Sequence, residues 1–369
     1  MNARERVLAV VNRKVPDRIP KDLSWGLCPA KEEEFRRRTG KEDYYEYFDL
    51  DVRILDFAPT RLKRDFSQYY IGRDTERGFS INEWGVGSGR SQDESLHFEH
   101  IISPFKEGMT EEEAAAFPLP DFLEEYRHSH FKKTVEDYHE RGLAVCGSLV
   151  QTIFEKSWAI RGFEETMMDM LVEPEAISIL FDRITELRIQ QMKLMVEAGI
   201  DVLMLGDDVG MQSGMLMGVD TWREFLKPRM AKIIREAKKI RPDLPVFYHS
   251  CGDPGAIIPE LIEIGVTVLN PIQPECLDHQ FVKETYGDKL AFWGGISAQT
   301  NLSFGTPEQV KEEVKRCIEV LGKDGGYLIG PNHMVEPEVP WENLEAFFEA
   351  VELYGDYGNS VSQEKSCQL

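Results

Sequence analysis

The chain lacks the long apolar runs that membrane and exported proteins carry. No segment approaches membrane-spanning length, and the opening MNARERVLAVV contains no apolar core of the kind found in a signal peptide. Cysteine is also scarce, because six cysteines scattered over 369 residues do not form the pattern of a disulfide framework. We therefore expect a soluble cytoplasmic protein.

Positive charge is in deficit as well. The chain has 43 lysines and arginines against 65 aspartates and glutamates, which gives a formal net charge of −22, and no Lys/Arg cluster overrides that balance. Such an excess of negative charge repels nucleic acid and anionic membrane surfaces. We expect neither among the partners. With 42% hydrophobic residues, the chain can still bury a large core.

What the sequence does contain is a regular alternation of apolar strand-like segments with amphipathic helical ones. The expected strands are Ile19–Leu23, Asp51–Phe57, Ala144–Val150, Asp201–Leu205, Val246–His249, Val266–Leu269, Leu290–Trp293 and Tyr327–Ile329. Strands that alternate with helices indicate parallel βα units. A closed (β/α)₈ TIM barrel, an α/β fold, is the simplest architecture with eight such units, and its functional site lies at the carboxyl ends of the strands.

One region departs from this alternation. Residues 58–117 mix glycine, aromatic and charged residues without a steady period, which predicts hairpins and an inserted lid near the N-terminal end. We therefore expect a single TIM-barrel domain over residues 1–358 with a polar tail at 359–369. The lid could also pack at an interface, so a homo-oligomer stays open.

The segment VFYHSCGD, Val246–Asp253, carries the strongest chemical signal. Successive side chains of a strand alternate between its faces, so His249 and Cys251 point the same way, roughly 7 Å apart along the strand. An imidazole and a thiolate at this spacing can bind one zinc ion. The alternative is a buried histidine and a small apolar cysteine at a strand end.

Polar residues also follow the other strands. The expected strand-end residues are Asp207, Asp208, Asn270, Gln273, Gly294, Gly295 and His333, and the barrel brings them to one cavity. The two aspartates could act in catalysis, or they could cap a helix or pair with an arginine. His333 could be a ligand, a general acid or an ordinary loop histidine.

Several motifs, in order, resemble the uroporphyrinogen decarboxylase superfamily. They are RERVLAVVNRKVPDRIP, DDVGMQ, HSCG, GVTVLNPIQPE, GDKLAFWGGI, GTPEQV and GGYLIGPNH. The resemblance implies a (β/α)₈ fold and, within the superfamily, is strongest to the zinc methyltransferase-like branch that includes O-demethylase components. Methyltransferases of this branch carry H-x-C, matched by His249 and Cys251, and later P-x-C-G. Here that later segment reads Pro331-Asn332-His333-Met334, so a histidine stands where the third ligand would be a cysteine.

The decarboxylase branch is the alternative that the resemblance implies. Those enzymes carry an arginine-bearing segment after the first strand that binds the substrate's carboxylates. The matching stretch here, Ser24–Lys31, has no arginine, and a substrate with many carboxylates needs cationic partners. His333 does stand where the decarboxylases also have a histidine. A barrel that binds without catalysing is a third possibility, favoured by the departure at His333-Met334.

From this resemblance we expect methyl transfer between a small methylated, possibly methoxyaromatic, substrate and a separate corrinoid protein or a thiol. His249 and Cys251 would hold zinc, and the ligand set would be completed by His333 or by one of Asp207 and Asp208. We expect His333, Asp207 and Asp208 to act in catalysis. The expected substrate contacts are Asn270, Gln273, Trp158 and Arg161, with Phe163, Trp25, Trp84 and Trp293 as further candidates. The alternative for Trp158, Arg161 and these further candidates is ordinary loop packing, with a surface salt bridge for Arg161.

Overall fold

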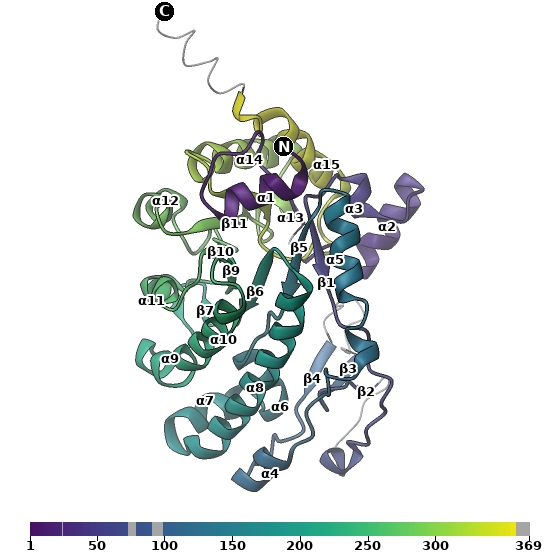
Figure 1. Ribbon diagram of the computed structural model, residues 1–369, viewed down its shortest axis with the longest axis vertical. Coiled ribbons are helices and arrows are strands. Elements are labelled where there is room, and N and C mark those ends of the chain that lie inside the picture. The colour runs from purple at the N-terminus through teal and green to yellow at the C-terminus, as the bar shows by residue number, and fades with distance from the viewer. Residues whose placement is uncertain (24, 73–78, 91–98, 359–369) are drawn as a thin grey trace, which may run out of the picture.

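The computed structural model describes residues 1–23, 25–72, 79–90 and 99–358 (Figure 1). The predicted polar tail at 359–369 and Ser24 therefore lie outside the described residues, as do parts of the predicted lid. Within the described ranges, none of the helices is both long enough and apolar enough to cross a bilayer.

A curled parallel sheet forms the centre of the fold. Its strands, in spatial order, are β1 (Val52–Leu55), β5 (Ala144–Ser148), β6 (Val202–Gly206), β9 (Val246–His249), β10 (Val268–Asn270), β11 (Ala291–Ile296) and β12 (Tyr327–Pro331). Every neighbouring pair in this order is parallel. Seven of the predicted strands are thereby confirmed, and the fold is α/β with helices around the sheet (Figure 1).

The predicted eighth strand, Ile19–Leu23, is wrong as a regular strand. Ile329 of β12 donates its N–H to the Pro20 carbonyl and accepts one from Asp22, and a single parallel bridge joins Lys21 to Ile329. On the other side, Asp51 donates to the Lys21 carbonyl. Proline has no N–H, so the ladder cannot extend through this position. The short segment nevertheless joins both edges of the sheet by hydrogen bonds.

Alternate strand residues fill the interior of the curled sheet. These buried side chains are Val52, Ala144, Cys146, Val202, Met204, Phe247, Val268, Ala291, Trp293 and Leu328. Helix α1 (Ala3–Val11) packs Val7, Val10 and Val11 against them. It lies at the amino ends of the strands, where Arg4 donates to the carbonyl of Gly142, just before β5 (Figure 1). The opposite, carboxyl end is therefore left for polar residues.

Helices surround the sheet much as the sequence predicts. The remaining longer helices are α2 (Pro29–Thr39), α5 (Phe131–Glu140), α6 (Phe154–Arg161), α7 (Phe163–Val172), α8 (Pro174–Ala198), α10 (Lys227–Ile240), α12 (His279–Tyr286), α14 (Pro307–Leu321) and α15 (Trp341–Tyr354). Local signals define their ends: Thr306 and Gln309 form a capping box at the start of α14, and Gly199 ends α8 in the left-handed conformation.

The described part of residues 58–117 forms hairpins, as predicted. Strands β2 (Ser80–Ile81), β3 (Gly87–Arg90) and β4 (Glu99–Ile102) make an antiparallel sheet, followed by α4 (Glu111–Ala116). This insertion packs against α6, where Phe105 donates to the carbonyl of Ile160. Because α6 follows the carboxyl end of β5, the insertion lies on the side of the barrel where the predicted site residues gather. Its action as a lid remains a prediction.

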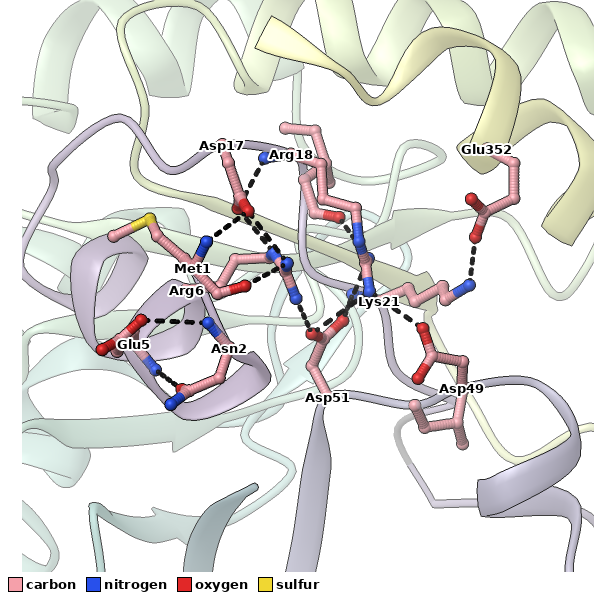
Figure 2. A network of polar contacts seen from close by, with 12 residues as sticks. Met1, Asn2, Glu5, Arg6, Asp17, Arg18, Lys21, Asp49, Asp51 and Glu352 are labelled. Atoms are coloured by element: carbon pink, nitrogen blue, oxygen red, sulfur yellow. Dashed lines mark hydrogen bonds and ion pairs between the residues drawn. The ribbon is translucent and has the colours of Figure 1, made fainter. Parts of the chain in front are cut away.

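A network of charged residues surrounds the buried Asp51 at the amino ends of the strands (Figure 2). Arg6 donates to its Oδ1 at 2.6 Å, Arg18 to its Oδ2 at 3.3 Å, and the Lys21 backbone to its Oδ2 at 2.9 Å. Burial raises the pKa of Asp51, and the two guanidinium groups and the Lys21 N–H oppose that rise. Asp51 directly precedes β1, so this network connects α1, the Pro20–Asp22 segment and the sheet.

We predict that Asp51→Ala lowers the free energy of unfolding by about 3 kcal/mol, because it removes the buried carboxylate that Arg6 and Arg18 share and leaves the buried Arg6 paired with the exposed Asp17. The matched control is Asp49→Ala, which removes an exposed carboxylate that also pairs with Arg18. An exposed pair of this kind contributes at most about 1 kcal/mol. Urea unfolding followed by circular dichroism measures both, and equal losses would contradict the special role of Asp51.

Candidate metal centre

Three ligand atoms of different chemistry meet at the carboxyl ends of β6 and β9. They belong to Asp208, His249 and Cys251, and all lie within 4.8 Å of one another. The Nε2 of His249 is 3.5 Å from the Cys251 sulfur and 3.4 Å from the Asp208 Oδ1. An imidazole, a thiolate and a carboxylate are the three side-chain ligands that zinc takes in proteins, so the donor set fits that ion.

The backbone holds these three residues close. His249 ends β9 directly opposite Gly206 of β6. A Cβ at Gly206 would lie 2.5 Å from the His249 nitrogen, so only glycine allows this approach. The backbone N–H of Cys251 donates to the Asp208 Oδ1 at 2.8 Å, which fixes the carboxylate over the turn. Two short strand ends thus produce the cluster.

The surroundings of this cluster disfavour both the thiolate form of Cys251 and the protonated form of His249. Burial and the nearby Asp208 raise the pKa of the Cys251 thiol. Burial lowers the pKa of the His249 imidazole, and the nearby His333 lowers it further. Asp208 and the hydrogen bond to Asn270 oppose this decrease. A bound cation would reverse the penalty on the thiolate, since zinc stabilises the deprotonated form of a cysteine ligand.

The two adjacent aspartates have different surroundings. Asp207 is buried, and its carboxylate accepts hydrogen bonds from the backbone N–H groups of Ile153 and Glu155 at 3.0–3.1 Å. It therefore satisfies the start of α6, which is the capping role that the sequence left open. Burial raises its pKa to about 6. Of the two aspartates, Asp208 is the one that lies beside His249 and Cys251.

His333 lies two residues beyond β12, at the same end of the barrel as His249. Its side chain is 45% exposed, and its Nδ1 is 3.4 Å from the Glu336 carboxylate. Its charge affects His249, so the two rings are neighbours, yet it does not belong to the close group of three. Within the described chain, Asp208 is the third candidate ligand beside His249 and Cys251. The sequence had left this position open between His333 and the two aspartates.

The predicted substrate contacts Asn270 and Gln273 both form hydrogen bonds with the segment His249–Gly252. Asn270 accepts a hydrogen bond from the His249 Nδ1 and donates to the Trp293 carbonyl at 3.0 Å. Gln273 accepts from the Gly252 backbone at 3.0 Å. The Gln273 Nε2 is buried without an acceptor among the residues that the structure describes. Both amides thus support the loop around Cys251.

Trp158 and Arg161 on α6, the other predicted substrate contacts, are engaged in packing. The Arg161 guanidinium binds the Asp169 carboxylate at 2.7 Å and the Phe105 carbonyl at 2.6 Å, and the Trp158 ring packs edge-on against Phe163. This is the packing alternative that the sequence allowed.

Among the other tryptophans, Trp25 contacts the cluster directly. Its ring packs edge-on against His249, with 5.1 Å between ring centroids. Trp293 packs against Phe247 deeper in the barrel. Trp84 lies beneath the Arg188 guanidinium, away from the three ligand atoms. Trp25 is therefore the aromatic candidate that the structure brings to the site.

Sequence reasoning missed Glu155. This buried residue lies in the first turn of α6, and its Oε2 accepts the backbone N–H of Asp208 at 3.0 Å. Burial, together with the charges of Asp208 and Asp207, raises its pKa to about 8. In the sequence it looks like an ordinary acidic residue in the first turn of a helix, so no local pattern marks it.

We predict that Glu155→Gln removes part of the pH dependence of stability. Because the folded-state pKa of Glu155 is about 8 against an ordinary value of 4.5, the folded protein keeps a proton that the unfolded chain releases between these values. Stability must therefore fall as pH rises through this window, and the glutamine variant lacks that part of the fall. Urea unfolding of metal-free protein at several pH values tests this, with the exposed Glu164→Gln as control. A constant difference between wild type and Glu155→Gln would contradict it.

Comparisons with known proteins identify relatives of this chain. The family model of uroporphyrinogen decarboxylase (URO-D) matches residues 122–354, more than half of the chain. The methylcobamide:CoM methyltransferase MtaA of Methanosarcina barkeri is 30% identical over 171 residues, 46% of this chain and 47% of that protein. The uroporphyrinogen decarboxylase of Hydrogenobaculum sp. is 23% identical over 212 residues, 57% of this chain and 58% of that protein. The chain thus spans about half the length of the curated relatives it matches.

A solved structure extends the likeness to the whole fold. A methyltransferase from Methanosarcina mazei superposes with a TM-score of 0.68 at 18% identity, over 96% of this chain and 99% of that one. The sequence motifs, the curled parallel sheet and the family match all lead to one assignment. The chain belongs to the uroporphyrinogen decarboxylase family.

Proposed function

We propose that the protein is a zinc-dependent methyltransferase that moves a methyl group between a small methylated substrate and a corrinoid protein or a thiol. The observation that carries the proposal is the convergence of Asp208, His249 and Cys251. Catalytic zinc sites in proteins use three protein ligands and keep a fourth position for substrate. The similarity to a methylcobamide:CoM methyltransferase supports methyl transfer, and a corrinoid partner, over other zinc chemistry.

Asp208, His249 and Cys251 would hold the ion. When bound, zinc acts as a Lewis acid that polarises an ether oxygen or stabilises a thiolate. The carboxylate and the thiolate balance the charge of the ion, so the centre as a whole is close to neutral. The Cys251 N–H and the buried position of His249 keep the three ligands oriented before substrate arrives.

Two residues beside the cluster can handle a proton. Burial and the charges of Asp208 and Asp207 raise the pKa of Glu155 to about 8 in the metal-free protein, which favours its protonated form near neutral pH, and its carboxyl group accepts the Asp208 N–H. His333 is half-exposed and pairs with Glu336. An ether is a poor methyl donor because an alkoxide or phenolate is a poor leaving group. A proton delivered to the leaving oxygen therefore lowers the barrier. We assign this role to one of these two side chains, with Asp207 as the helix cap.

The decarboxylase is the second candidate, because curated relatives include uroporphyrinogen decarboxylases. Its substrate carries several carboxylates, and residues 25–31 supply no arginine to pair with them. The one cation there, Lys31, is buried and already bonded to Glu34 and the Val339 carbonyl. Leaving buried carboxylates unpaired is strongly unfavourable. A barrel that binds without catalysing would retain neither zinc nor turnover.

Metal analysis of the purified protein tests the centre directly. We expect about one zinc per chain. Cys251→Ser and His249→Ala should lose it, because a serine hydroxyl is a poor zinc ligand and alanine offers none. Asp208→Asn should weaken zinc binding, whereas His333→Ala should keep zinc and lower turnover.

The control for these variants is Cys276→Ser, whose sulfur bonds to Gln212 outside the cluster, and it should keep the metal. Wild-type protein that never holds zinc, or Cys251→Ser that holds it fully, would remove the basis of the proposal. If His333→Ala loses zinc and Asp208→Asn does not, then His333 is the third ligand.

We predict that the protein does not turn over uroporphyrinogen at a useful rate, because residues 25–31 lack the cations that its carboxylates require. Product analysis with wild-type enzyme is sufficient. In the parallel assay, methoxylated aromatics and small methylated compounds are offered with a corrinoid protein, and methylation of the corrinoid is followed by its absorption spectrum. Robust decarboxylation without methyl transfer would establish the second candidate instead.

A further inference from the structure

Asn270 occupies a special position relative to the candidate metal centre. It ends β10, is 1% exposed, and lies directly opposite His249 in the parallel register of β9 and β10. Its side chain makes two hydrogen bonds. The Nδ2 donates to the Trp293 carbonyl at 3.0 Å, and the Oδ1 contacts the Nδ1 of His249.

The Trp293 carbonyl decides which way the amide of Asn270 faces. A carbonyl oxygen only accepts hydrogen bonds, so the amide NH₂ must face it and the amide oxygen must face His249. In the reversed orientation, two oxygens without a hydrogen between them would meet in a buried site, which is unfavourable. The oxygen of Asn270 therefore faces the imidazole.

This orientation fixes the proton on the imidazole. The Oδ1 of Asn270 is an acceptor, so the Nδ1 of His249 must be the nitrogen that carries the hydrogen. A neutral imidazole carries one hydrogen, which leaves the Nε2 with a free lone pair. That Nε2 is the atom 3.5 Å from the Cys251 sulfur and 3.4 Å from the Asp208 Oδ1. The lone pair thus points into the group of three ligand atoms.

We propose that Asn270 is a positioning residue for the metal centre and not a substrate contact. It selects the Nδ1–H tautomer of His249 and sets the plane of its ring, so that the Nε2 is ready to bind zinc without rearrangement. The ring of Trp25, edge-on to His249, restrains the same plane from another side. This inference rests on the proposed zinc centre for its purpose, whereas the tautomer itself follows from the hydrogen bonds alone.

The chain offers a matched control in Asn343. This asparagine on α15 is also 1% exposed, and its Nδ2 donates to the carbonyls of Leu302 and Gly305 at 3.0 and 2.8 Å. It has the same side chain, the same burial and similar partners, but it contacts none of the three ligand residues in the described structure. A leucine at either position removes buried hydrogen bonds at nearly constant volume.

The first measurement is zinc affinity by competition with a chelator. Asn270→Leu should weaken zinc binding by about 10–100-fold, the usual effect of removing an outer-shell partner of a ligand histidine. Asn343→Leu should lower the melting temperature without changing zinc affinity. Asn270→Asp should recover most of the affinity, because its carboxylate accepts the same Nδ1–H, although its second oxygen then meets the Trp293 carbonyl and stability falls. Equal zinc affinity in wild type and Asn270→Leu would overturn the proposal.

The second measurement reads the tautomer in metal-free protein. Nitrogen-15 NMR of labelled histidine should show His249 protonated at Nδ1 and bare at Nε2 in wild type and in Asn270→Asp, and a mixture of tautomers in Asn270→Leu. A wild-type His249 protonated at Nε2 would overturn the inference even if every variant folds poorly. Wild type that has the expected tautomer but binds no zinc would instead remove the proposed function, so the two failures are distinguishable.

Discussion

The site depends on the parallel hydrogen-bond register of β6, β9 and β10. That register sets Gly206, His249 and Asn270 in one row across three neighbouring strands. The glycine gives space for the close approach of β9, the histidine offers one of the three candidate ligand atoms, and the asparagine bonds to the other nitrogen of its ring. A shift of one residue in β9 would turn His249 to the outer face of the sheet and bring Tyr248 inward. The chemistry of the site is therefore a consequence of strand pairing.

The same constraint separates the two aspartates. Because adjacent residues at a strand end point in different directions, Asp207 turns to the N–H groups at the start of α6, whereas Asp208 turns to Cys251 and His249. One carboxylate therefore stabilises the helix that carries Glu155, and the other lies beside His249 and Cys251 as a candidate ligand. Glu155 joins the two, since its carboxyl group holds the Asp208 backbone.

Much of this arrangement could be predicted from the sequence, because the periods of strands and helices are local properties. The period of a strand predicted that His249 and Cys251 lie close together, but β9 ends at His249, and Cys251 lies in the turn that follows. The rest is tertiary. Which aspartate reaches the cluster depends on where α6 begins, and whether Asp208 or His333 stands closer depends on loop paths after β6 and β12. The strand expected at Ile19–Leu23 failed because Pro20 allows hydrogen bonds only around it. Glu155 carried no local signal at all.

The short segment around Lys21 has a kinetic consequence. It joins β12 at Ile329, close to the other end of the chain, and it joins the chain at Asp51, directly before β1. During synthesis this segment therefore keeps the edge that faces β12 unpaired until β12 has emerged, and contacts between such distant residues form slowly. An exposed edge of this kind invites pairing with other chains. The Pro20–Asp22 segment, which closes the sheet between β12 and β1, is thus a place where a growing chain needs protection from aggregation.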